Sequence, residues 1–323
     1  MPRNDRADAR AAEFGPRDLS GRRYLVTGAS TGLGYFTAAN LATRGARVVI
    51  TGRSAARLDA AASAIGKPGL VTTLPFDIGE LDEVRGAADS LVAGAAGTGA
   101  GFDGLVLNAG VVHPPARREA TSDGVERIFA TNVLGHYALL GRLTGAAVLR
   151  EDAAVVWLGS LAPGLTRAHL QDVQLRGGYT AWNAYAQSKL ATQVLGMEGD
   201  RRARAAGGHV RSIVAHPGYS TGGLTPTVAG VHEPSLAKRA VDSLLVFAAQ
   251  GKDDGARCQL RAVTDPELRG GETIVPAYVT KGRPVLGASH WRSYDPELGE
   301  RLWNYCASLA GVEPDFAAIS ART

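Results

Sequence analysis

Three glycines placed directly after a short apolar run constrain the fold of this chain more than any other feature. The apolar run is Tyr24-Leu25-Val26, which is typical of a buried parallel strand. Gly28, Gly32 and Gly34 follow it, and residues 35–42 then have helical composition. Glycines let a backbone approach an anion closely, and the free N–H groups of a first helical turn point at it. The segment therefore predicts a strand, an anion-binding turn and a helix, although an ordinary tight turn explains the glycines alone equally well.

Apolar runs and helical segments alternate along most of the chain. The apolar runs are residues 24–26, 48–50, 70–76, 105–107, 155–158 and 210–215. The helical segments are residues 35–42, 54–65 (with Ser54 placed to cap it), 81–96, 123–149, 182–206, 236–249 and 298–309. This alternation predicts a parallel sheet with helices on both faces, and right-handed crossovers then make a doubly wound α/β fold of the Rossmann type.

We expect one such domain over residues 21–323. Residues 1–20 mix Arg, Asp, Ala and Pro without periodicity and predict a disordered leader. Residues 222–250 open on a Gly- and Pro-rich stretch and are placed to form a substrate lid. Residues 280–323 predict a small C-terminal extension, and the stretch 278–294 is interpreted as a loop.

Composition excludes several classes of protein. The net charge is only +4 over 323 residues, without lysine-rich blocks or interleaved aromatics, which argues against a nucleic-acid platform. The two cysteines lack metal-ligand spacing and the seven histidines form no paired motif, so no metal site is expected. No membrane-spanning run and no secretory signal are present, which predicts a cytoplasmic protein.

The apolar runs end in small or polar residues, where doubly wound sheets bind ligands. Arg53 follows the second run, after Thr51 and Gly52, and stands 19 residues after Gly34. At this point of a dinucleotide fold an acid selects NAD, whereas an arginine accommodates the 2′-phosphate of NADP. Arg53 therefore indicates NADP(H), unless it is simply a solvated surface arginine. Asp77 and Ile78 directly follow the third run and are placed to contact adenine.

A tyrosine and a lysine stand four residues apart in a helical segment. Tyr185 and Lys189 therefore share one face of the helix. A phenol has a pKa of about 10, and an adjacent ammonium together with a positive nicotinamide ring would lower that pKa. Tyr185 could then exchange a proton with a carbonyl or alcohol oxygen, while Ser160 holds the same oxygen by a hydrogen bond. The pair alone is weak evidence, because such pairs occur by chance.

From about Ser20 to Gly222 the chain resembles the short-chain dehydrogenase/reductase family. The motifs that carry the resemblance are, in chain order, the glycine turn, Asn108-Ala109-Gly110, Ser160, the Tyr185–Lys189 pair and Pro217-Gly218. The resemblance implies a catalytic tetrad of Asn132, Ser160, Tyr185 and Lys189, in which the asparagine helix holds a water that extends a proton relay from the lysine. It also implies a cofactor site for NADP(H) formed by Gly28, Ser30, Thr31, Gly32, Leu33, Gly34, Arg53, Asp77, Ile78, Asn108, Ala109, Gly110, Tyr185, Lys189, Pro217, Gly218, Tyr219 and Thr221.

One spacing and one departure refine this resemblance. Ser160 and Tyr185 are 25 residues apart, against about 13 in many members, which looks like the retinol-dehydrogenase-like branch. That branch often uses NADP(H) and includes relatives that reduce carbon–carbon double bonds. The family usually has a threonine or serine five residues after Pro217, where this chain has Gly222. Either a one-residue shift lets Thr221 make the nicotinamide carboxamide contact, or the contact is lost; of the two we favour Thr221.

The sequence thus predicts hydride transfer between NADP(H) and a carbonyl or alcohol of a lipophilic small molecule, and the family resemblance implies a homodimer or homotetramer. Reduction of an activated C=C bond and a non-catalytic NADP(H)-binding regulator are the alternatives, and the intact Ser-Tyr-Lys-Asn set argues against the second. A nucleotide-sugar epimerase or dehydratase shares the Tyr-Lys pair but fits the glycine spacing and the insert less well. The side chains placed to line an apolar substrate pocket are Leu161, Pro163, Leu165, Tyr179 and Trp182, although core or loop packing explains each of them about as well.

Overall fold

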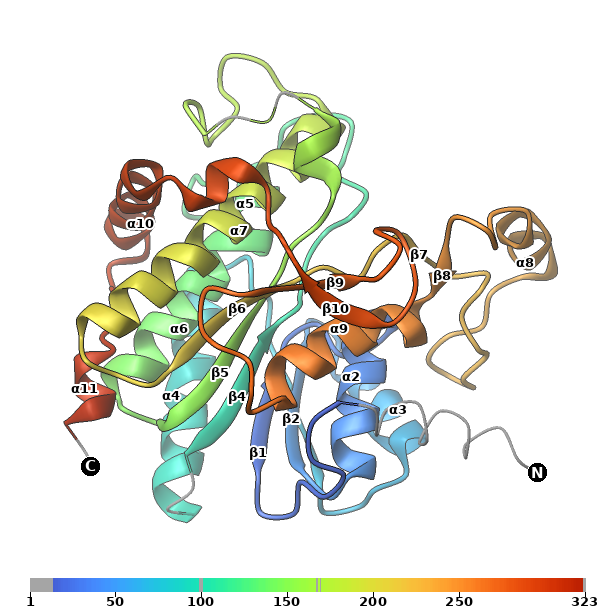
Figure 1. Cartoon of the computed structure of the whole chain (residues 1–323), viewed down its shortest axis with the longest axis horizontal. Coiled ribbons are helices and arrows are strands. Elements are labelled where there is room, and N and C mark those ends of the chain that lie inside the picture. The colour runs from blue at the N-terminus through green and yellow to red at the C-terminus, as the bar shows by residue number, and fades with distance from the viewer. Residues whose placement is uncertain (1–13, 99–100, 167, 169, 322–323) are drawn as a thin grey trace.

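The computed structural model describes residues 14–98, 101–166, 168 and 170–321, and its centre is an eight-stranded sheet (Figure 1). Its strands are β1 (Arg23–Val26), β2 (Arg47–Gly52), β3 (Val71–Pro75), β4 (Phe102–Leu107), β5 (Leu149–Leu158), β6 (Arg211–Ala215), β9 (Thr273–Pro276) and β10 (Pro284–Gly287). Their order is β10-β9-β6-β5-β4-β1-β2-β3, and every neighbouring pair is parallel except β9 with β10. The strand order reverses between β1 and β4, which is where such sheets bind ligands.

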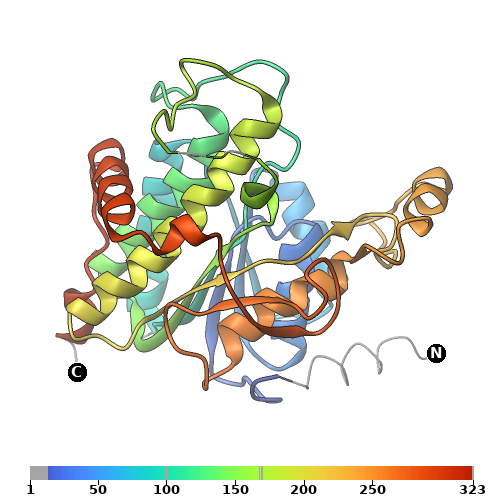
Figure 2. The same ribbon diagram turned by 45° about the horizontal axis from the view of Figure 1, so that its top comes forward.

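Helices cover both faces of the sheet (Figures 1 and 2). One face carries α2 (Gly32–Thr43), α3 (Ala55–Ile65) and α9 (Lys252–Thr264). The other carries α4 (Leu81–Thr98), α5 (Arg127–Phe129), the π turn η1 (Ala130–Leu134), α6 (Gly135–Gly145), α7 (Ala181–Ala205), α10 (Pro296–Ala310) and α11 (Ala317–Ser320). Short elements complete the chain: the 3-10 turns η2 (Ala162–Leu165) and η3 (Trp291–Tyr294), α8 (Leu236–Ser243), and the two-stranded pair β7 (Ser220–Thr221) with β8 (Gln250–Gly251).

Alternation along the strands divides the core between the two layers. Leu25 contributes to the core beneath α4, α6 and α7, whereas its neighbours Tyr24 and Val26 contribute to the core beneath α2 and α9. The C-terminal segment belongs to the first core, because the fully buried Trp303 of α10 packs edge-to-face on Tyr137 of α6, with ring centroids 4.9 Å apart. The doubly wound fold predicted from the sequence is therefore confirmed.

The helix predicted over residues 123–149 is shorter than expected. It begins at Arg127, because the Glu126 carboxylate accepts hydrogen bonds from the N–H groups of Ile128 and Phe129 at 3.0 and 2.7 Å. It ends at Gly145, and Ala147 adopts a positive φ of 50°. Leu149 belongs to the strand β5, which extends back beyond the predicted run because it pairs with β4.

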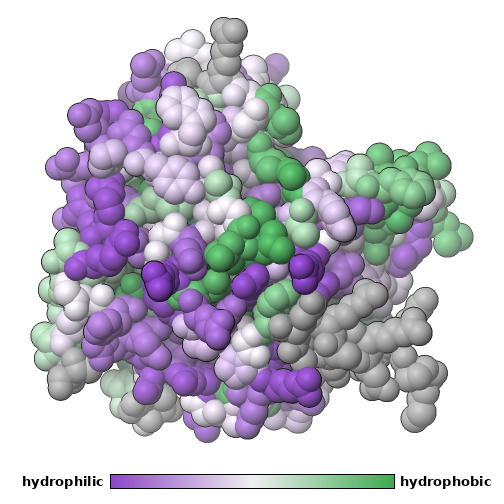
Figure 3. Space-filling view, in the orientation of Figure 1, coloured by the Kyte–Doolittle hydropathy of each residue, from purple (hydrophilic) through white to green (hydrophobic). Residues whose placement is uncertain are grey.

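The C-terminal third differs most from the predictions. Helix α9 and strands β9 and β10 were not predicted, and β10 and η3 lie inside the stretch interpreted as a loop. Helix α9 was missed because its sequence is rich in charged residues, although its apolar side chains pack in the core. The helix predicted over residues 236–249 ends at Ser243 as α8, and its apolar side chains are exposed, up to 89% at Phe247 (Figure 3).

The predicted leader is described only from residue 14. In that part Leu19 is buried, and its N–H donates to the Arg44 carbonyl at 2.7 Å. Leu19 therefore packs against the domain, and residues 1–13 of the leader lie outside the described residues. Among the described helices, none combines the length and the apolar character that crossing a membrane requires.

Candidate active site

The turn between β1 and α2 needs its glycines for backbone geometry and for space. Gly28 and Gly32 have positive φ values of 64° and 63°. A Cβ on Gly34 would lie 2.5 Å from the Asn108 side-chain nitrogen and 2.6 Å from the Gly28 carbonyl oxygen. The N-cap residue Thr31 makes no side-chain cap, and the first turn of α2 holds no acidic residue. The first N–H groups of α2 are thus available to an anion.

The end of β4 holds this turn in place. The Asn108 side chain donates to the carbonyls of Thr27 and Gly28 at 2.8 and 3.2 Å. The Thr27 hydroxyl oxygen accepts from the backbone N–H groups of Asn108 and Ala109 at 2.9 and 3.0 Å. Asn108 and Ala109 therefore shape the turn directly. Gly110 follows, where a Cβ would lie 3.0 Å from the Asn132 side-chain oxygen.

The residues expected to contact the adenosine lie at the ends of β2 and β3. The Arg53 side chain is 74% exposed and lies 3.9 Å from the Asp77 carboxylate. The other oxygen of Asp77 accepts from the Gly79 N–H at 2.9 Å. Ser30 lies beside Gly52, because a Cβ built on Gly52 would be 3.6 Å from the Ser30 hydroxyl oxygen. Ile78 is buried within the core and exposes little of its side chain to a ligand.

Ser160 and Tyr185 are brought together by β5 and α7. The two hydroxyl oxygens lie 3.4 Å apart, and the Ser160 oxygen also accepts from the Ala162 N–H at 3.1 Å. Lys189 lies one helical turn after Tyr185 and is buried, and its ammonium donates to the Leu158 carbonyl at 2.7 Å. Three of the four expected catalytic residues thus converge at the carboxyl end of β5.

Asn132 is buried in the π turn and contacts the same helix through Ser188. Its side-chain nitrogen donates to the Ser188 hydroxyl at 2.9 Å, and its oxygen accepts from the Val111 N–H at 2.7 Å. The Ser188 hydroxyl in turn donates to the Tyr185 carbonyl at 2.8 Å. Asn132 therefore fixes the position of α7 against η1. π turns are frequent at functional sites.

Burial dominates the electrostatics of these groups. It raises the pKa of Tyr185, and the hydrogen bond with Ser160 acts in the opposite direction. It lowers the pKa of Lys189 to about 8. The sequence argument expects Lys189 to lower the pKa of Tyr185, but the lysine ammonium is directed to the Leu158 carbonyl instead. In the protein alone, desolvation is therefore the larger influence on the phenol.

The residues after β6 form a second edge of the site. Gly218 has a positive φ of 67°, and its N–H donates to the His216 ring at 2.9 Å. The Pro217 carbonyl accepts from the Ser220 hydroxyl at 2.8 Å, and Tyr219 is half exposed. Thr221 lies in β7. Its hydroxyl is buried near the Asp242 carboxylate and has no well-formed hydrogen bond among the described residues.

Sequence reasoning did not assign two buried residues that support the site. Gln259 of α9 donates to the Leu33 carbonyl at 3.2 Å and to the Thr37 hydroxyl at 2.5 Å. His136 lies 2.9 Å from the Thr27 hydroxyl and 3.2 Å from the Asn132 carbonyl, so it connects the glycine turn to the π turn. Its helical position was readable in the sequence, whereas Gln259 required the fold, because α9 was not predicted.

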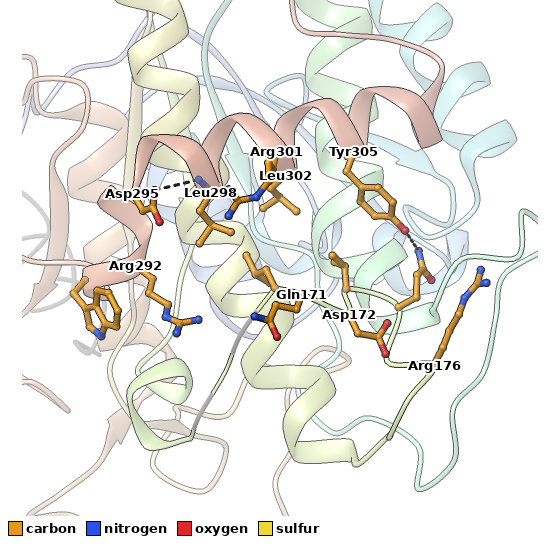
Figure 4. A pocket seen from close by; sticks show the side chains of 13 residues that line it. Gln171, Asp172, Arg176, Arg292, Asp295, Leu298, Arg301, Leu302 and Tyr305 are labelled. Carbon is orange, nitrogen blue, oxygen red and sulfur yellow. Dashed lines mark hydrogen bonds between the residues drawn. The ribbon is translucent and has the colours of Figure 1, made fainter.

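The substrate side is only partly as expected. Trp182 is half exposed, with its ring centroid 6.1 Å from that of Tyr185, but Leu165 is 73% exposed. A cavity of 870 Å³ lies elsewhere, between residues 170–176 and the C-terminal segment 291–305 (Figure 4). Across it, the Gln174 amide donates to the Tyr305 hydroxyl at 2.9 Å. None of its lining residues belongs to the expected catalytic or cofactor set.

Comparison with known proteins agrees with this arrangement. A family model described as short chain dehydrogenase matches residues 22–229. The chain belongs to the short-chain dehydrogenase/reductase family. It is 31% identical over 299 residues to polyprenol dehydrogenase of Mus musculus, covering 90% of this chain and 84% of that protein. Retinol dehydrogenase 12 of Mus musculus is 30% identical over 302 residues, covering 91% and 88%. The retinol-dehydrogenase-like branch is thereby confirmed.

Solved structures share the fold, and one of them is described as a short chain dehydrogenase. A crystal structure of an uncharacterised protein from Mycobacterium paratuberculosis has a TM-score of 0.75 and 32% identity, over 94% of this chain and 98% of that one. A short chain dehydrogenase from Burkholderia cenocepacia J2315, solved in complex with NADP, has a TM-score of 0.57 and 26% identity, over 79% and 95%. The chain is thus an enzyme of the short-chain dehydrogenase/reductase type.

Proposed function

We propose that this enzyme transfers a hydride between NADP(H) and a carbonyl or alcohol group of a lipophilic small molecule. The convergence of the Ser160 and Tyr185 hydroxyls at 3.4 Å, with Lys189 one turn along α7, carries the proposal. Two relatives are named for retinol and polyprenol, which are isoprenoid alcohols. Alcohols of that class, or their aldehydes, are the substrates we propose.

Each catalytic side chain then has a defined task. Reduction adds a hydride to the carbonyl carbon and a proton to its oxygen, and the nicotinamide cofactor supplies the hydride. The Tyr185 hydroxyl donates the proton in reduction, and in oxidation the Tyr185 phenolate accepts the proton of the alcohol. The Ser160 hydroxyl holds the same oxygen by a hydrogen bond. Asn132 fixes α7 through Ser188. Lys189 lies one helical turn after Tyr185, with its ammonium held by the Leu158 carbonyl.

The protein's own residues fit a phosphorylated dinucleotide. The glycine turn leaves backbone N–H groups uncapped at the start of α2, and no acidic side chain stands there to repel an anion. Arg53 is exposed, and the permanent charge of its guanidinium suits a 2′-phosphate. The buried Thr221 hydroxyl, which lacks a well-formed hydrogen bond, is proposed to bind the nicotinamide carboxamide.

The decisive experiment compares Tyr185→Phe with the wild-type enzyme. Absorbance at 340 nm would follow NADPH with a panel of lipophilic aldehydes, ketones and enones, including the aldehydes of retinol and of a polyprenol. We expect kcat/KM to fall at least about 100-fold, because positioned acid–base groups contribute roughly 10²- to 10⁴-fold. NADPH affinity, measured by fluorescence, should stay within a few-fold. The matched control Tyr278→Phe, which removes an exposed phenol, should keep full activity.

The alternatives give different results in the same assay. Turnover of enones but of no carbonyl would show reduction of a C=C bond instead. Tight NADPH binding without turnover of any compound in the panel would support the non-catalytic regulator. Retention of more than about a tenth of wild-type activity by Tyr185→Phe would remove this residue from acid–base catalysis.

A further inference from the structure

Lys252 lies beside the glycine turn, although the two are far apart in the sequence. It is the first residue of α9, directly after β8. A Cβ built on Gly32 would lie 3.5 Å from the lysine Cδ and 3.7 Å from its Nζ. The lysine side chain therefore reaches the start of α2, where the first N–H groups are uncapped.

The backbone of Lys252 is held in this position by the segment after β6. Its N–H donates to the Thr225 hydroxyl oxygen at 2.9 Å. The Thr225 hydroxyl donates to the Thr221 carbonyl at 2.7 Å. A second contact joins the same segment to the turn, since the Thr31 hydroxyl donates to the Val231 carbonyl at 3.2 Å. The position of Lys252 is thus fixed by the fold.

The ammonium of Lys252 is not neutralised. Its Nζ has no hydrogen bond or ion pair among the described residues, unlike Lys189 and Lys281, which donate to carbonyls, and Lys238, which pairs with Asp242. Burial lowers its pKa, and the charge of Lys238 lowers it further.

The two acids that follow Lys252 on α9 are directed elsewhere. The Asp253 carboxylate faces the backbone of Gly251, and Asp254 lies 3.7 Å from Arg257. A half-buried cation without an anionic partner is unfavourable, because no attractive interaction offsets the free energy lost on desolvation. An anionic ligand at the glycine turn would supply that attractive interaction.

We propose that Lys252 binds the pyrophosphate of the dinucleotide, together with the N–H groups at the start of α2. The inference rests on the proposed function, since it requires a dinucleotide in the glycine turn. The helix terminus alone offers only about half a positive charge. A full positive charge from the segment that follows the predicted lid would add to it. Both NADP(H) and NAD(H) carry the pyrophosphate, so Lys252 supplies affinity that does not depend on the 2′-phosphate.

Equilibrium binding to purified protein tests this assignment without reference to activity. Binding of NADPH, NADH, ADP-ribose and adenosine 2′-monophosphate would be measured for wild type, Lys252→Met, Lys252→Arg and the control Lys67→Met, which removes an exposed lysine after α3. We expect Lys252→Met to raise Kd about tenfold or more for the three pyrophosphate compounds, as loss of a charged hydrogen bond does. Binding of adenosine 2′-monophosphate should be unchanged, and Lys252→Arg should recover most of the affinity.

The possible outcomes distinguish a failure of the proposed role of Lys252 from a failure of the proposed function. Wild-type binding of none of the dinucleotides would overturn the proposed function and the role of Lys252 with it. Tight wild-type binding with unchanged affinity in Lys252→Met would overturn only the role of Lys252. Equal losses for all four compounds, including adenosine 2′-monophosphate, would show a structural role and overturn it as well. Lys252→Gln serves in place of the methionine variant if that protein does not fold, as judged by circular dichroism.

Discussion

Two buried histidines predict a specific loss of stability in mild acid. Burial lowers the pKa of both His136 and His216 from 6.5 to about 4. Between these values the unfolded chain binds a proton at each histidine and the native protein does not, so stability is present above pH 6.5 and lost as the pH falls towards 4. From pH 7.5 to pH 5, each group then costs about 2 kcal/mol of the free energy of unfolding, and both together about 4 kcal/mol.

Urea unfolding followed by far-UV circular dichroism at pH 7.5 and pH 5 measures this loss. His136→Gln and His216→Gln should each reduce the acid-dependent loss by about 2 kcal/mol relative to wild type, because glutamine does not titrate. Each variant is compared with itself at the two pH values, so any constant cost of the substitution cancels. The range stops at pH 5 because ordinary carboxyl groups take up protons mainly below it.

The exposed His113 provides the matched control. His113→Gln should lose as much stability between pH 7.5 and pH 5 as the wild type does. If His136→Gln and His216→Gln also lost as much stability as the wild type, the two histidines would not be the source of the acid sensitivity. The argument that burial keeps them uncharged in the native protein would then be wrong.

Two further substitutions address the dinucleotide site. Arg53→Asp should weaken NADPH binding about tenfold or more and shift preference towards NADH, because it replaces a cation by an anion where the 2′-phosphate is proposed to bind; an unchanged ratio of the two dissociation constants would exclude Arg53 from that role. Gly34→Ala should lower the free energy of unfolding by about 1–3 kcal/mol, because its Cβ would lie 2.5 Å from the Asn108 side chain. Gly86→Ala on α4 is the control, because a Cβ at this position would meet nothing within 4 Å. It should raise the free energy of unfolding by about 1 kcal/mol, since alanine has the higher helix propensity. Equal melting temperatures for the two variants would contradict the steric argument.

The first two thirds of the fold could be predicted because local signals and tertiary packing agree there. Runs such as Val155 to Leu158 are buried on both faces of the sheet and are therefore continuously apolar. Ser54 caps α3 as expected, accepting from the Arg57 N–H at 3.4 Å. Short-range chemistry specified these elements, and the long-range contacts did not override it.

The remaining elements could not be predicted because distant contacts decide them. Helix α9 contains many charged residues, so its sequence does not reveal a buried side. Its apolar side chains are buried because they pack against the sheet. Strand β9 exists because it pairs with β6, and β10 because it pairs with β9. The segment after α8 does not continue as a helix, and its apolar side chains do not reach the core.

The sequence by itself determined the doubly wound architecture, the glycine turn and the order of Ser160, Tyr185 and Lys189, because periodicity and short spacings carry that information locally. Only the tertiary structure decided that the Lys189 ammonium meets the Leu158 carbonyl, that Gln259 supports the start of α2, and that Lys252 lies beside Gly32. These contacts join residues 31 to 226 positions apart. Their geometry depends on how the sheet and its helices pack together, which no local pattern encodes.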